Sequence, residues 1–120
     1  MFIHAFITDE NGYNMRDLGT LGGNVSYGHA INNLGQVAGT STTATGYNRA
    51  FLTDANGSNM RDLGNLAQRN DFESWANGLN DRGQVVGWSA TLKGMSAFVT
   101  DPNGTGMYDL NLLTNIPSGV

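Results

Sequence analysis

The chain has 120 residues, which suits one small domain, and its 17 glycines favour short strands joined by tight turns. Its net charge of −4 and its six scattered Lys and Arg residues exclude the clustered positive surface that nucleic acids and anionic membranes require, so we expect neither partner. The absence of Cys excludes disulfides, thiolate metal sites and a Cys nucleophile.

Neither a long helix nor a targeting segment is visible in the sequence. No stretch repeats apolar residues at helical spacing over three turns. No apolar run approaches the length of about 18 residues that spans a membrane. The start, MFIHAF, has no basic segment ahead of a long apolar run, so no signal peptide is visible.

The first predicted element is a hairpin near the start of the chain. Its sequence, TDENGYNMRDLG, runs from Thr8 to Gly19, and Asn-Gly between two apolar runs is a strong hairpin signal. The segment returns as TDANGSNMRDLG from Thr53 to Gly64, and as the more divergent TDPNGTGMYDLN from Thr100 to Asn111. The sequence therefore predicts one hairpin that is used three times.

Two four-stranded units follow this first hairpin. In the first unit we expect strands near Ala30–Asn32, Gln36–Thr40, Arg49–Thr53 and Asn59–Leu63. In the second unit we expect them near Gly78–Asn80, Gln84–Ser89, Ser96–Thr100 and Gly106–Leu110. With the two strands of the half unit, this gives ten strands. The predicted boundaries are a half unit at 1–21, units at 22–66 and 67–113, and a tail at 114–120.

The links between units are the least similar segments of the repeat. They are TLGGNVSYGH, residues 20–29, and NLAQRNDFESW, residues 65–75, and we expect them to be crossovers between sheets. The strands HAFI, RAFL and SAFV are apolar on both faces, as in sheets that are stacked between similar sheets. We therefore predict an all-β, β-propeller-like fold of four-stranded antiparallel units, with about two and a half blades.

The order HAFITD, MRDLGTLGG and AINNLGQVAGTS resembles the HAF repeat of predicted extracellular bacterial proteins, which is named after residues such as His4–Phe6. The resemblance extends from His4 to about Asn111, although the later copies read RAF at Arg49 and SAF at Ser96. It implies a β-propeller-like array of four-stranded units and an extracellular location. It supplies no catalytic residues.

An open array of two and a half units leaves apolar sheet faces exposed at both ends, which favours association. We therefore expect a homo-oligomer. The apolar residues expected to lack cover are Phe2, Ile3, Phe6 and Ile7 at one end, and Met107, Leu110, Leu112 and Leu113 at the other.

The motif Asp-x-Asn-Gly has two possible interpretations. It occurs at Asp9–Gly12, Asp54–Gly57 and Asp101–Gly104. Oxygen ligands at alternate positions resemble the start of a calcium loop, but no Glu follows at a late position. The alternative is a hairpin turn in which Asp or Asn bonds the local backbone, and we favour it.

Other recurrent or rare polar residues also have structural explanations. Asp17, Asp62 and Asp109 recur in the unit, and we expect buried carboxylates that accept backbone N–H groups. His4 and His29 are the two histidines, and two imidazoles without further ligands make a poor metal site. We therefore expect neither a metal nor another cofactor.

The loop NDFESW carries the candidate binding residues Asp71, Phe72, Glu73 and Trp75. An aromatic ring beside carboxylates suits a sugar, whereas the alternative is that Trp75 and Trp88 pack between units. Two carboxylates in one loop are weak evidence for a glycosidase, and the sequence has neither a phosphate-binding glycine loop nor a Gly-x-Ser-x-Gly nucleophile motif.

We expect a non-catalytic, self-associating interaction scaffold with a protein or glycan ligand. The alternative is a lectin-like carbohydrate-binding module that uses the 70–75 loop.

Overall fold

The computed structural model describes residues 2–115, and within them the protein is all-β, as predicted. The first sheet pairs β1 (Ala5–Ile7) with β2 (Arg16–Gly19). The second contains β3 (Gly22–Ile31), β4 (Val37–Thr43), β5 (Asn48–Leu52) and β6 (Arg61–Asp62). The third contains β7 (Ser74–Leu79), β8 (Val85–Thr91), β9 (Gly94–Thr100) and β10 (Met107–Asp109).

Every sheet is antiparallel, and neighbouring strands in each sheet are consecutive in the sequence. The longest helical segment among residues 2–115 is the 3-10 segment η4 (Leu110–Asn115), and no described helix is long and apolar enough to cross a membrane. The predicted number of ten strands is confirmed for this part of the chain.

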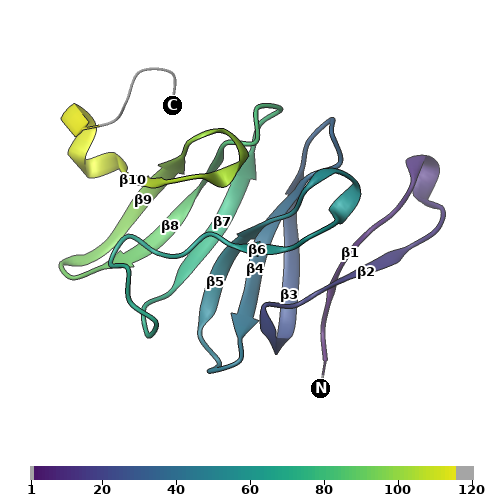
Figure 1. Cartoon of the computed structure of the whole chain (residues 1–120), viewed down its shortest axis with the longest axis horizontal. Coiled ribbons are helices and arrows are strands. Elements are labelled where there is room, and N and C mark those ends of the chain that lie inside the picture. The colour runs from purple at the N-terminus through teal and green to yellow at the C-terminus, as the bar shows by residue number, and fades with distance from the viewer. Residues whose placement is uncertain (1, 116–120) are drawn as a thin grey trace.

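The three sheets stand next to one another in chain order, with β3–β6 in the middle (Figure 1). One core cluster joins the middle sheet to the third: Ala38, Ala50, Leu52, Ala76, Val85 and Phe98. A second cluster joins it to the first: Ala5, Ile7, Val37 and Phe51. The middle sheet is therefore covered on both faces, which explains why RAFL is apolar throughout.

The Asn-Gly turns of the three hairpins are short 3-10 segments: η1 (Glu10–Gly12), η2 (Ala55–Gly57) and η3 (Pro102–Gly104). In η2, Asn56 has φ 59° and Gly57 has φ 74°, so both residues adopt the left-handed conformation. Asn tolerates this region better than most residues, and Gly adopts it without steric cost. Gly12 and Gly104 at the other two turns also have a positive φ, as Asn-Gly hairpin turns require.

The links between sheets are shorter than the predicted crossovers at residues 20–29 and 65–75. Most of residues 20–29 belongs to β3, which pairs with β4 from Gly22↔Thr43 to Ile31↔Val37. Register shifts interrupt this ladder on both sides of Tyr27, so the strand does not alternate regularly in sequence. The second link is a loop until β7 begins at Ser74.

Two residues at the ends of the array are covered, contrary to the prediction. Ile7 is buried in the cluster with Val37 and Phe51, because its side chain faces the middle sheet. Met107 packs against the other cluster, between the second and third sheets. Leu113 lies outside the residues whose side chains the structure describes.

Candidate functional site

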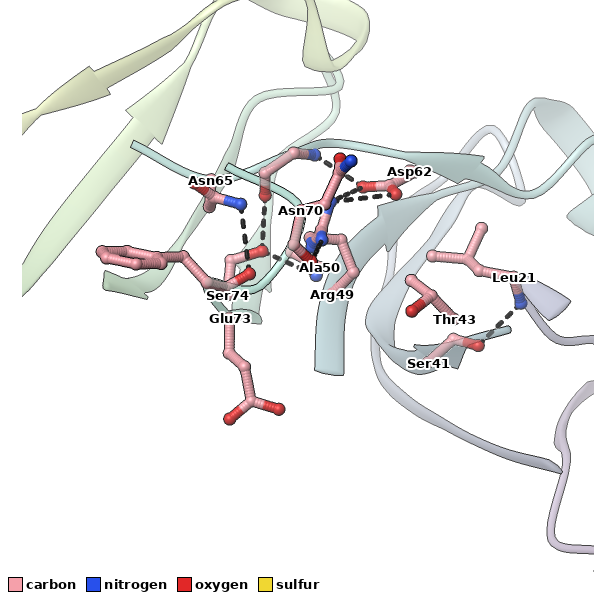
Figure 2. Close-up of polar contacts among 12 residues, drawn as sticks. Leu21, Ser41, Thr43, Arg49, Ala50, Asp62, Asn65, Asn70, Glu73 and Ser74 are labelled. Atoms are coloured by element: carbon pink, nitrogen blue, oxygen red, sulfur yellow. Dashed lines mark hydrogen bonds and ion pairs between the residues drawn. The ribbon is translucent and has the colours of Figure 1, made fainter. Parts of the chain in front are cut away.

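The loop between β6 and β7 is held by the side chain of Arg49, which comes from β5 (Figure 2). Arg49 Nη1 lies 3.2 Å from Asp62 Oδ2, and Nη2 donates to Asn70 O at 3.0 Å. Only 9% of the Arg49 side chain is exposed. Asn65 Nδ2 donates to the carbonyls of Arg69 and Phe72, so the loop is also fixed from within.

Ser74 anchors the end of this loop to the middle sheet. Its hydroxyl accepts the N–H of Ala50 at 2.9 Å and donates to Gly64 O at 2.6 Å. Ser26 makes the same pair of bonds at the preceding interface, with Ala5 N and Gly19 O. At each interface, this buried hydroxyl thus satisfies two backbone groups that have no partner within the sheets.

The predicted binding residues Asp71, Phe72 and Glu73 lie in this loop. Asp71 is exposed and forms an ion pair of 3.7 Å with Arg69, whose guanidinium lies 5.6 Å from the centre of the Phe72 ring. Glu73 Oε2 accepts bonds from Asn48 N at 2.7 Å and from Asn48 Nδ2 at 3.0 Å. The Glu73 carboxylate therefore joins the loop to β5.

The fourth predicted residue, Trp75, lies on another surface. Ser74 is buried toward the middle sheet, and side chains alternate along a strand, so Trp75 faces the opposite side. There it is the cross-strand partner of Trp88 in β8. The structure thus separates Trp75 from the face on which Ser74 and Arg49 meet.

A hollow of about 370 Å³ lies between the Arg49 side chain and the loop. Its polar lining includes Arg49, Asn65, Gln68 and Arg69, with Leu63 and Met107 as apolar walls. Arg49 Nε is buried and has no hydrogen-bond partner among the described residues.

Sequence reasoning did not identify Arg49 as a site residue. Its position in the repeat is that of His4, and both side chains bond the carboxylate that follows on the next strand of their sheets. His4 Nδ1 lies 2.8 Å from Asp17 Oδ2, as Arg49 Nη1 lies near Asp62. In the sequence, the recurrence of a basic residue (His4 or Arg49) ahead of the repeated Asp could have identified Arg49.

The recurrent Asp residues accept backbone N–H groups, as predicted, at 2.7 Å from Gly19, 2.7 Å from Gly64 and 2.8 Å from Asn111. The expected burial is wrong, because the Asp17 side chain is 63% exposed and that of Asp62 is 39% exposed. The bonds from His4 and from the Gly19 N–H lower the pKa of Asp17.

Each Asp-x-Asn-Gly turn is held by its own hairpin. The Asp9 carboxylate accepts Asn14 Nδ2 at 2.7 Å and Arg16 Nη1 at 2.8 Å, and both bonds lower its pKa. In the third copy Tyr108 replaces the Arg, and its hydroxyl donates to Asp101 Oδ2, which raises the pKa of Tyr108.

The same Arg residues connect neighbouring sheets. Arg16 Nη2 donates to Asn56 O at 3.4 Å, and Arg61 Nη1 donates to Asn103 O at 3.0 Å. The repeated segment therefore forms a hairpin that binds the next hairpin. Within residues 2–115, no group of three or more His, Asp or Glu side chains could hold a metal ion.

No protein-family model, curated protein or solved structure matches the chain. The resemblance to the HAF repeat therefore stays a prediction.

Proposed function

We propose that the chain is a non-catalytic, propeller-like repeat protein of the HAF type that associates with itself and presents its loops for binding. The observation that carries this proposal is the uncovered face of β7–β10. Val86 and Trp88 on this face are 43% and 50% exposed. Ala38 and Thr40, at the same positions of the middle sheet, are 0% and 4% exposed because β7–β10 covers them.

The other end of the array has a complementary uncovered side chain. Phe51 and Phe98 each face the preceding sheet and are 0% exposed. Phe6 occupies the same position of the repeat and is 54% exposed. In a head-to-tail contact, Phe6 of one copy would pack on the uncovered face of β7–β10 in the next copy, as Phe98 packs on the middle sheet.

Such a contact joins two different surfaces, so it produces a ring if the rotation closes and a filament if it does not. Large apolar side chains in a contiguous exposed patch are characteristic of association surfaces. Burying each of them stabilises a complex by roughly 1.5–3 kcal/mol.

Sedimentation equilibrium at micromolar concentration tests this proposal. The parent chain should exceed its monomer mass of 12.8 kDa, and the variant Trp88→Asp should sediment as a folded monomer. Leu92→Asp is the matched control, because Leu92 is exposed in the β8–β9 turn outside both faces, and it should associate like the parent. A parent chain that stays monomeric over the whole concentration range contradicts the proposal.

The second candidate is a lectin-like module, and the hollow beside Arg49 favours it. Its volume of about 370 Å³ is within the range of small-molecule sites, and its lining includes the exposed polar side chains of Gln68 and Arg69. The ligand would be a sugar whose hydroxyls hydrogen-bond the Gln68 amide and the Arg69 guanidinium.

A glycan array followed by calorimetric titration tests the lectin-like candidate. Gln68→Ala should weaken binding of any glycan found, while Thr105→Ala, in the exposed turn after η3, should not. The absence of glycan binding, or equal binding by the Gln68→Ala variant, excludes this hollow as the site.

A further inference from the structure

A second groove lies along the free edge of β1. It has a volume of about 620 Å³ and is formed by residues 3–8 around β1, residues 26–31 of β3, and Val37. Among the described strands, β1 pairs with β2 along one edge and with none along the other. An unpaired strand edge beside an apolar floor is the geometry that accepts an added strand.

In the other two sheets, the edge that corresponds to the free edge of β1 is paired with a strand. β5 and β9 correspond to β1 in the repeat, and each pairs with a preceding strand, β4 or β8. In both pairs a glycine lies opposite the central Phe: Gly39 opposite Phe51, and Gly87 opposite Phe98. Among residues 2–115, no strand places a glycine opposite Phe6 along the free edge of β1.

The floor of the groove corresponds in the repeat to residues that are covered at the interface between the second and third sheets, but here those positions are exposed. Ala76 and Leu79 face the middle sheet, where Ala76 is 0% exposed and Leu79 packs on the core. Gly28 and Ile31 occupy the same positions in β3, yet Gly28 is exposed and Ile31 is 59% exposed. The groove is thus the space that two further strands of the first sheet would fill.

Thr8 corresponds to two threonines that each bond the strand next to their own. In the second sheet, Thr53 N donates to Val37 O at 2.9 Å, and Thr53 Oγ1 accepts from Val37 N at 2.9 Å. In the third sheet, Thr100 Oγ1 accepts from Val85 N at 3.0 Å. Thr8 has the same place in the repeat, at the end of β1.

We propose that the free edge of β1 binds a two-stranded hairpin of a partner chain whose sequence follows the pattern of residues 25–43 of this protein. The second donated strand would have the order Gln-Val-Ala-Gly-Thr-Ser, with its Gly opposite Phe6 and its Ala over Gly28 and Ile31. Its first apolar residue would bond Thr8 as Val37 bonds Thr53. The hairpin completes a four-stranded sheet.

The glycine makes this pattern selective. A Cβ added to Gly39 would overlap Tyr27 O of the first hairpin strand and lie 2.8 Å from Phe51 Cζ. A Cβ added to Gly87 would overlap Trp75 O in the same way. A donated hairpin with a larger residue at this place would therefore have to separate its own two strands or displace Phe6.

The test uses the full chain and a fluorescently labelled synthetic peptide with the sequence of residues 25–43, VSYGHAINNLGQVAGTSTT. Fluorescence anisotropy should show saturable binding. The same peptide with Gly39→Val should bind at least about tenfold more weakly, because overpacking opposes it. Chemical-shift changes on binding should concentrate in β1 and β3.

Protein variants locate the contact. Thr8→Val conserves shape but removes the hydroxyl acceptor, and loss of one hydrogen bond should weaken peptide binding about fivefold. Thr105→Val, in the exposed turn after η3, is the matched control and should bind like the parent. The inference does not depend on self-association, so the monomeric Trp88→Asp variant should bind the peptide normally.

The inference is overturned if there is no saturable binding at millimolar peptide, if the Gly39→Val peptide binds equally, or if the shift changes are confined to the uncovered face of β7–β10. If instead Thr8→Val lowers the oligomer mass of the chain while the peptide does not compete with association, the occupant of the groove is a second copy, and the hairpin proposal is wrong.

Discussion

The interface between the second and third sheets is complete, whereas the interface between the first and second sheets is built from half a unit on one side. Both use the same device, in which a Phe from the third strand of a unit faces the preceding sheet. Phe51 and Phe98 are fully buried, yet Phe6, which has no preceding sheet among the described residues, is 54% exposed. The same motif therefore has different energetic importance in each copy.

In this repeat, equivalent positions carry the same type of residue, but whether the residue is buried depends on the sheet next to it. Ala5 and Ile7 alternate with Phe6 and are buried, because their neighbour β3–β6 is present. Repeat proteins are stabilised by such contacts between adjacent units. Substitutions at equivalent positions should therefore differ according to the interface that each position belongs to.

The largest expected difference is between equivalent phenylalanines. Phe51→Ala and Phe98→Ala should each lower the free energy of unfolding by about 3–5 kcal/mol, because each leaves a cavity where the ring is fully buried. Phe6→Ala should lower it by less than about 1 kcal/mol, since exposed substitutions have small effects. Urea unfolding followed by circular dichroism measures all three, and equal losses would contradict the assigned burial.

The turn glycines should show a smaller difference. A Cβ at Gly57 would lie 2.7 Å from Leu18 Cδ2 and 3.0 Å from Ile7 Cγ2, while a Cβ at Gly12 meets no atom within 4 Å. Gly12→Ala should cost roughly 1–2 kcal/mol, from the left-handed conformation alone.

Gly57→Ala should cost about 1–3 kcal/mol more, because it adds overpacking to the same backbone strain. The midpoint of urea unfolding compares the two variants. Identical midpoints would mean that the η2 turn does not contact the first sheet.

Substitution of the two equivalent serines, Ser74 and Ser26, should affect global and local stability differently. Ser74→Ala removes the partner of Ala50 N and Gly64 O inside the complete interface, and should lower the free energy of unfolding by about 1–3 kcal/mol.

Ser26→Ala should instead increase local opening of β1 and β2, with a smaller change in global unfolding, because the first sheet has two strands among residues 2–115. Native-state hydrogen exchange distinguishes these outcomes. Faster exchange of β7–β9 amides in the Ser26→Ala variant would disprove the local effect.

The smallest expected effect is a dependence on acid confined to the first sheet. The pKa of Asp17 lies below its ordinary value of 3.8 because of bonds from His4 and the Gly19 N–H, and the pKa of Asp9 is lowered by Asn14 and Arg16. Because these shifts favour the ionised forms, the stabilisation is complete above pH 3.8 and is lost as pH falls through the lower folded pKa values.

Chemical shifts of β1–β2 amides should therefore move toward unfolded values in this acid window before those of β8 and β9 do. The double variant Asp9→Asn, Asp17→Asn should lack this early change. If it keeps the change, the acid sensitivity comes from other groups.

The sequence was sufficient to predict the hairpin turns and the number of strands. Asn56 and Gly57 specify a left-handed turn through their own backbone preferences, so the prediction needed no knowledge of neighbours. The length of β3 was not predictable, because its Gly-rich, bulged ladder with β4 lacks regular alternation. The burial of Ile7 and the partial burial of Met107 depended on neighbouring sheets that the sequence does not position.

The candidate sites show the same division. The sequence predicted a loop that carries Asp71, Phe72 and Glu73, since its length and composition are local properties. Only the tertiary structure brought Arg49 to this loop, directed Trp75 to the opposite face, and left an open edge at β1. The sequence by itself thus determined the turns and the repeat, through short-range conformational preferences. The tertiary structure decided which copies of the repeat are covered, because burial depends on contacts between residues far apart in the chain.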